Sequence, residues 1–119
     1  MATVVNWQYS GATGVADPIY SPLASDPGLR DLLELFAATL PQRLQNLERL
    51  ADEGDWEGLR RQAHQLKGAA GSYGFAPLSV TAAQLETIAR QNPDPEKIRQ
   101  LLDQLRDLAS RVTTESPGI

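Results

Sequence analysis

Four stretches of this sequence repeat apolar residues at steps of three and four, and this spacing constrains the fold more than any other feature. In an α-helix such spacing puts the side chains on one face, so each stretch predicts an amphipathic helix. The four stripes are Leu29, Leu32, Leu33, Phe36, Leu40, Leu44, Leu47 and Leu50; Trp56, Leu59, Ala63, Leu66 and Ala70; Leu78, Ala82, Leu85, Ile88 and Ala89; and Ile98, Leu101, Leu102, Leu105, Leu108 and Val112. Short connections and the lack of a convincing strand predict an all-α, antiparallel four-helix bundle.

Capping residues give the expected ends of these helices. Asp26 with Pro27 begins the first helix and Gly54 ends it, Asp55 precedes the second, Gly74 separates the second from the third, Asn92-Pro93 ends the third, and Asp94 with Pro95 begins the fourth. Pro41 lies inside the first stripe, where it removes a backbone donor. It predicts either a kink or a junction between two helices.

The 119 residues are enough for one compact domain with a single core. We expect the bundle over residues 26–112, an extended N-terminal arm over residues 1–25 and a polar tail over residues 113–119. In the arm, Trp7 and Tyr20 either lie against the bundle or contact another molecule.

Composition excludes several classes of function. A net charge of −4 disfavours nucleic acid as a partner. The absence of cysteine excludes disulfides, and together with the single histidine it makes a zinc site very improbable. No apolar run is long enough to span a membrane, and no secretion signal is recognisable. We therefore expect a cytoplasmic protein without a membrane partner.

The single histidine, His64, has unusual neighbours. At 100° per residue it lies roughly 120° from the centre of the second stripe, so it faces solvent. Gly68, one turn later, leaves the ring uncovered, and Gly71 continues this bare strip although each glycine costs helix stability. Lys67 and Arg60 lie within a turn of His64 and make the surroundings cationic, which suits an anion.

Folding the second and third helices back on each other about Phe75 puts position 64 opposite position 86, which is Glu86. A carboxylate facing one ring nitrogen would hold its proton and leave the other nitrogen free as a nucleophile. Taken singly, His64, Lys67 and Arg60 are typical of a solvated helix surface, and Glu86 is typical of an ordinary salt bridge. Their combination is what indicates a function.

The segment Ala-His-Gln-Leu-Lys-Gly-Ala-Ala-Gly at residues 63–71, continued by Ser-Tyr-Gly-Phe, resembles the phosphorylation-site helix of histidine-containing phosphotransfer (HPt) domains. Leu85-Glu86 also matches the family's pattern, and the resemblance extends over about residues 28–112. It implies that His64 is the phospho-acceptor and that Lys67 neutralises the phosphoryl group. It further implies that Gly68 gives a partner access and that Glu86 orients the imidazole.

The same resemblance implies a phosphorelay component that exchanges a phosphoryl group with aspartates of response-regulator receiver domains, with a hybrid histidine kinase as a further partner. It implies no cofactor on this chain, because the receiver brings the divalent metal, and no ATP site, which agrees with the lack of a G-x-x-x-x-G-K motif. The resemblance thus implies a phosphoryl carrier rather than an enzyme.

Two other interpretations remain open at the level of sequence. Residues 71–75 fit equally well in the phosphorylation-site domain of a chemotaxis-type histidine kinase, for which the donor would be an ATP-bound kinase domain. A helical interaction module, in which His64 has no covalent role and the bundle docks a partner, is an alternative of a different class.

Overall fold

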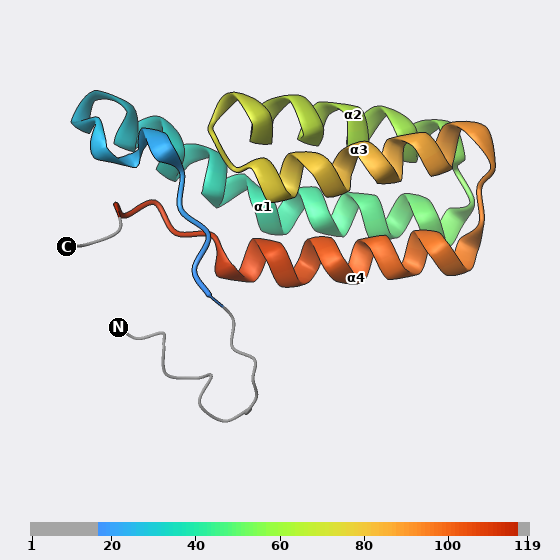
Figure 1. The fold of residues 1–119 in the computed structure, drawn as a ribbon. Helices are drawn as coiled ribbons and strands as arrows, with labels where there is room; N and C mark the ends of the chain where they lie inside the picture. Colours follow the sequence, from blue (N-terminus) through green and yellow to red (C-terminus); the bar gives the residue numbers. More distant parts are fainter. Residues whose placement is uncertain (1–16, 117–119) are drawn as a thin grey trace.

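The computed structural model describes residues 17–116, which form four α-helices and one short 3-10 helix. In chain order these are η3 (Pro22–Ser25), α1 (Pro27–Glu53), α2 (Trp56–Ser72), α3 (Ala76–Gln91) and α4 (Pro95–Arg111). Consecutive helices run in opposite directions, with α2 packed on α1 and α3, and α4 packed on α3 and α1 (Figure 1). The predicted antiparallel four-helix bundle is confirmed.

Aspartate side chains cap three of the four helices, as the sequence predicts. Asp26 accepts the N–H of Gly28, Asp55 that of Gly58, and Asp94 that of Glu96. Each bond satisfies a backbone donor that would otherwise lack a partner in the first turn.

The core is built from the apolar stripes that face one another inside the bundle. Its most deeply buried large side chains are Phe75, Leu33, Leu47, Leu59, Leu66, Leu78, Leu85, Ile98 and Leu105. Burial of so many leucines fixes how far each helix is rotated about its own axis, because a rotation would bring charged residues into the core. This rotation decides which residues of α2 face solvent.

The first helix continues without interruption through Pro41, so the alternative of two helices meeting there is wrong. Leu40 and Leu44, on either side of the proline, are both buried, while Pro41 itself is exposed. A proline on the outer side costs one backbone hydrogen bond. Packing of the inner face holds the helix together across this position.

Leu32, predicted to lie in the core, is 43% exposed, and nearby Leu35 is 65% exposed. The reason is visible in Figure 1, where the start of α1 runs past the turn between α2 and α3 and has η3 as its neighbour. Only one side of this part of α1 is covered. Leu33 and Phe36 lie on that covered side.

Residues 17–25 hold the start of the described chain against one end of the bundle, where α4 ends and α2 turns into α3. Ile19 pairs with Val112 in a single parallel β-bridge, in which its N–H donates to the carbonyl of Arg111 at 2.7 Å. The extended path predicted for the arm is interrupted at Pro22–Ser25, because the side chain of Ser21 caps the 3-10 turn by accepting the N–H of Leu23. Tyr20 is 39% exposed, and Trp7 lies outside the described residues.

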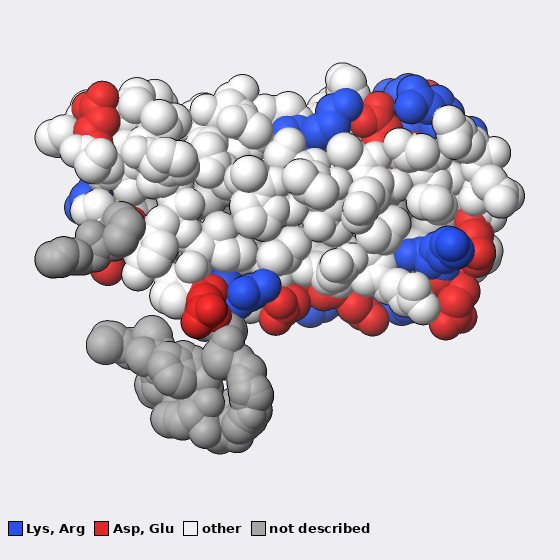
Figure 2. Space-filling view, in the orientation of Figure 1, with Lys and Arg blue, Asp and Glu red and all other residues white. Residues whose placement is uncertain are grey.

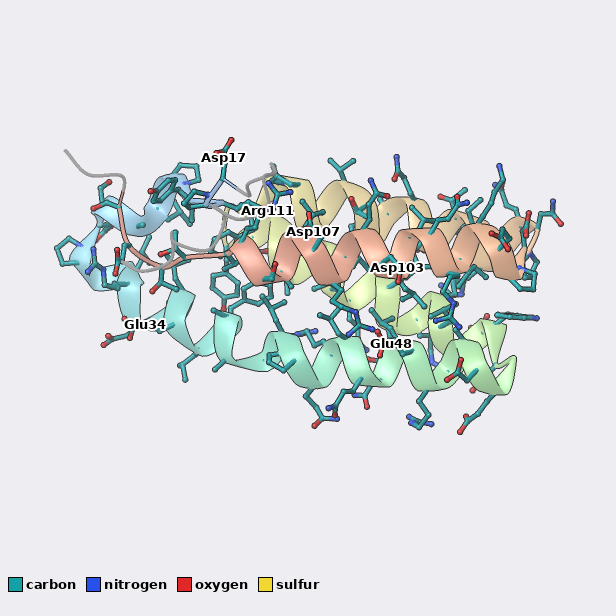
Figure 3. The ribbon with its side chains drawn as sticks, turned by 90° about the horizontal axis from the view of Figure 1, so that it is seen from below. Asp17, Glu34, Glu48, Asp103, Asp107 and Arg111 are labelled. Atoms are coloured by element: carbon teal, nitrogen blue, oxygen red, sulfur yellow. The ribbon has the colours of Figure 1, made fainter. Side chains whose placement is uncertain are left out.

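Charge is distributed unevenly over the bundle. The side formed by α1 and α4 carries Glu48, Asp103 and Asp107 (Figure 3), and Arg106 and Arg111 make ion pairs with Glu48 and Asp107 there. A broad region over the middle of α3 has no Lys, Arg, Asp or Glu (Figure 2). Over residues 17–116, no helix combines the length and the apolar character that crossing a bilayer requires.

Candidate functional site

His64 lies in the middle of α2 with its ring on the outside of the bundle. Its side chain is 59% exposed, whereas Ala63 and Leu66, its neighbours on the inner face of the helix, are buried. The same apolar stripe that packs α2 against the core therefore directs the imidazole outward. A reagent can approach the ring without a change in the bundle.

Glu86 of α3 joins His64 and Lys67 into one cluster. Its Oε2 lies 2.9 Å from Nδ1 of His64, and its Oε1 lies 2.9 Å from Nζ of Lys67. Only 5% of Glu86 is exposed, so both carboxyl oxygens depend on these two partners. The structure thus brings together the three residues that the sequence places on two different helices.

The surroundings of Glu86 keep it ionised. The hydrogen bond from Lys67 is the largest influence and lowers the pKa of Glu86 below its ordinary value; burial opposes this shift, and the hydrogen bond with His64 adds to it. An ionised carboxylate can only accept hydrogen bonds. The proton of the shared bond therefore belongs to Nδ1 of His64, and in the neutral form of the ring this leaves the lone pair on Nε2.

The two glycines after His64 differ in their surroundings. A Cβ atom added at Gly68 would meet nothing within 4 Å, so the surface one turn after His64 is open. At Gly71 a Cβ atom would lie 3.3 Å from Oγ of Ser79 on α3. The close packing of Ser79 therefore favours glycine at position 71, in addition to the access to His64 that the sequence suggests.

Arg60 lies one turn before His64, but its charge is engaged elsewhere. Its Nε and Nη2 donate to the two carboxyl oxygens of Glu57 at 3.0 and 2.7 Å. This bidentate pair raises the pKa of Arg60 and lowers that of Glu57, in both cases mainly through the side-chain hydrogen bonds. Of the two predicted cations, Lys67 is the one in direct contact with the cluster.

Two residues that influence the site were not singled out from the sequence. Glu57 pairs with Arg60 at the i, i+3 spacing typical of helix-surface ion pairs, so this contact was recognisable in the sequence. Ser79 donates its hydroxyl hydrogen to the carbonyl oxygen of Lys67 at 2.9 Å. No local sequence pattern predicts such a hydrogen bond between two helices. Within residues 17–116, no group of three or more His, Cys, Asp or Glu side chains is placed to hold a metal ion.

Comparison with protein families identifies the family of this chain. The model of the Hpt domain matches residues 31–115, which is more than half of the chain and contains α2, α3 and the whole cluster. The chain belongs to the HPt domain family. It therefore has a histidine phosphotransfer role in a phosphorelay, as a phosphocarrier module, and the family's partners are receiver domains and kinases of two-component systems. No curated protein and no solved structure gives a significant match.

Proposed function

We propose that Nε2 of His64 accepts a phosphoryl group from the aspartyl phosphate of a receiver domain and passes it to the aspartate of another. The observation that carries this proposal is the exposed ring of His64, whose Nδ1 is held by the buried carboxylate of Glu86 at 2.9 Å. A surface histidine without a function has no need for a buried acidic partner, because burying a carboxylate is costly unless it is paired.

In the transfer step, the Nε2 lone pair attacks phosphorus in line with the bond to the aspartyl oxygen. The N–P bond forms, the P–O bond breaks, and the aspartate leaves as a carboxylate. The ring keeps its Nδ1 proton and becomes positively charged, and the Glu86 carboxylate offsets that charge. The return reaction follows the same path backwards. The bundle therefore contributes position and electrostatics rather than a covalent partner of its own.

Lys67 is the residue that we assign to the phosphoryl oxygens. It lies three residues after His64 on the same side of α2, and its side chain is 36% exposed although Nζ contacts Glu86. A lysine can turn its flexible four-carbon chain while its carbonyl stays in the helix. Nζ can thus share its donors between Glu86 and the incoming phosphoryl group.

The surface of this chain next to His64 is suited to docking by a partner as large as a receiver domain. Gly68 presents open space one turn after the ring, and, apart from the largely buried Glu86, the surface over the middle of α3 has no Lys, Arg, Asp or Glu (Figure 2). We assign the divalent metal and the remaining catalytic groups to the receiver, and the ATP site to a separate kinase, which can be a hybrid kinase. This chain then acts as a carrier between them.

The test is transfer of radioactive phosphate from a panel of purified receiver domains that have been phosphorylated with acetyl phosphate. The expected result is an acid-labile label on the wild-type protein, no label on His64→Gln, and a normal label on Gln65→Ala, which changes the exposed neighbour of His64. Because the chain contains one histidine, any phosphohistidine must be at position 64. A label that persists in His64→Gln contradicts the proposal, as does the absence of label from every receiver and from an ATP-driven kinase.

A further inference from the structure

Lys67 is joined to α3 at two points, and only one of them involves its side chain. Nζ contacts Oε1 of Glu86, while the carbonyl oxygen accepts the hydroxyl hydrogen of Ser79 at 2.9 Å. Ser79 and Glu86 are seven residues apart, which is two helical turns or about 10 Å along one face of α3. Lys67 is therefore held against α3 by Ser79 at one position and by Glu86 two turns further along.

The bond from Ser79 depends on Gly71. In a regular helix the carbonyl of residue 67 already faces the N–H of residue 71 and keeps a second lone pair for another donor. A Cβ atom at position 71 would lie 3.3 Å from Oγ and 3.9 Å from Cβ of Ser79, which is closer than ordinary contact for the first of these pairs. The missing side chain of Gly71 admits Ser79 to the backbone of α2.

We propose that Ser79 is a positioning residue of the phosphotransfer site. Its bond to the Lys67 carbonyl, admitted by Gly71, fixes how far α2 is shifted along α3 and so keeps Glu86 opposite both His64 and Lys67. Packing of side-chain ridges into grooves sets the separation and the crossing angle of two helices. A directional hydrogen bond between the helices restrains sliding itself.

This inference rests on the proposed function, but the first measurement that tests it does not require phosphotransfer. The test compares Ser79→Ala, which removes the donor, with Ser79→Thr, which keeps a hydroxyl. Ser110→Ala is the matched control, because Ser110 also donates to a backbone carbonyl, that of Asp107 in the same helix, and lies on α4 away from the cluster.

The first readout is NMR of the unphosphorylated protein. Carboxyl chemical shifts report the pKa of Glu86, and ring nitrogen shifts report the tautomer of His64. In Ser79→Ala we expect the pKa of Glu86 to rise toward its ordinary value, because the Lys67 contact that lowers it most is loosened. We also expect the ring to lose its preference for the Nδ1–H tautomer. Ser79→Thr should restore both signals, and Ser110→Ala should leave both unchanged.

The second readout is the phosphotransfer rate. Displacement of reacting groups by a fraction of an ångström slows positioned reactions, so we expect Ser79→Ala to transfer on the order of tenfold more slowly than Ser110→Ala. If Ser79→Ala keeps the wild-type Glu86 pKa, His64 tautomer and rate and only melts earlier, Ser79 is a structural residue and the proposal is overturned.

Gly71→Ala provides a second variant should Ser79→Ala fail to fold. It keeps the hydroxyl, but its methyl group crowds Ser79, so we expect the same change in the pKa of Glu86. Wild-type behaviour of Gly71→Ala at the cluster would refute the role given to this glycine, and with it the proposal. If instead wild-type protein takes no phosphate from any receiver or kinase, the proposed function fails while the NMR comparison still decides the role of Ser79.

Discussion

Replacement of Gly68 by glutamine should make the bundle more stable and the phosphotransfer slower. A Cβ atom at this position meets nothing within 4 Å, so the new side chain causes no clash inside the protein. Glycine in a helix interior is about 1 kcal/mol less favourable than alanine, and glutamine is close to alanine, so the free energy of unfolding should rise by roughly 0.5–1 kcal/mol. For a domain of this size that corresponds to an increase in Tm of about 2–5 °C.

The same side chain extends into the surface that a receiver must approach to reach Nε2 of His64, one turn away. We expect a transfer rate reduced by about tenfold or more, since small displacements at a docked reaction centre have effects of that size. Thermal unfolding followed by circular dichroism and quenched-flow phosphotransfer measure the two changes separately. Ser110→Gln is the control, because it adds the same side chain to an exposed position of α4, which does not pack on α2.

The combination of a raised Tm with a reduced rate is what distinguishes blocked access from damage to the fold. If Gly68→Gln is stabilised and transfers phosphate at the wild-type rate, the surface over Gly68 is not part of the docking path. A lowered Tm would show that the space above Gly68 is occupied in solution.

Three further outcomes follow from the contacts of the cluster and of the turn before α3. The pKa of Glu86 is lower in the folded protein than its ordinary value of 4.5. Between these two pKa values the unfolded chain binds more protons than the folded chain, so the ionised carboxylate stabilises the fold. This contribution to the free energy of unfolding is complete above pH 4.5 and is lost as the pH falls through the folded pKa. Glu86→Gln should therefore lower the urea midpoint at pH 7, and its difference from wild type should shrink as the pH falls below 4.5; a difference that stays the same through this range would contradict this. Gly74→Ala should cost about 2 kcal/mol or more, measured by urea unfolding, because φ is +84° and the new Cβ would lie 2.5 Å from Oγ of Ser21; an unchanged midpoint would refute the strain. Arg60→Gln should change the transfer rate by less than about twofold, because its charge is paired with Glu57, and a large loss in a kinetic assay would place Arg60 in the phosphoryl site.

The arrangement of the four helices could be predicted because the determinants are local. Apolar spacing defines the inner face of each helix, and the aspartates at positions 26, 55 and 94 cap the helices at the predicted places. The exposure of His64 follows from the same spacing, since its direction is fixed once Ala63 and Leu66 are buried. The position of Glu86 opposite His64 followed from counting residues on either side of the turn, because two antiparallel helices of regular rise pair symmetrically.

What could not be predicted depends on contacts between segments distant in sequence. Leu32 belongs to an apolar stripe, yet it is exposed because only one side of the start of α1 is covered, and Leu32 lies on the other side. Pro41 breaks helices in general, but burial of its neighbours on the inner face outweighs the single hydrogen bond lost here. The bond from Ser79 to Lys67 depends on the axial shift between α2 and α3, which no sequence pattern specifies.

The account rests on one claim, that His64 reacts through Nε2 while Glu86 holds its Nδ1 proton. Phosphorus and nitrogen NMR of the ¹⁵N-labelled protein, phosphorylated by a receiver that transfers to it, tests this claim most directly. We predict coupling between phosphorus and Nε2 together with a protonated Nδ1 hydrogen-bonded to Glu86. Phosphorus on Nδ1, or a phosphorylated protein without any phosphohistidine signal, would contradict it.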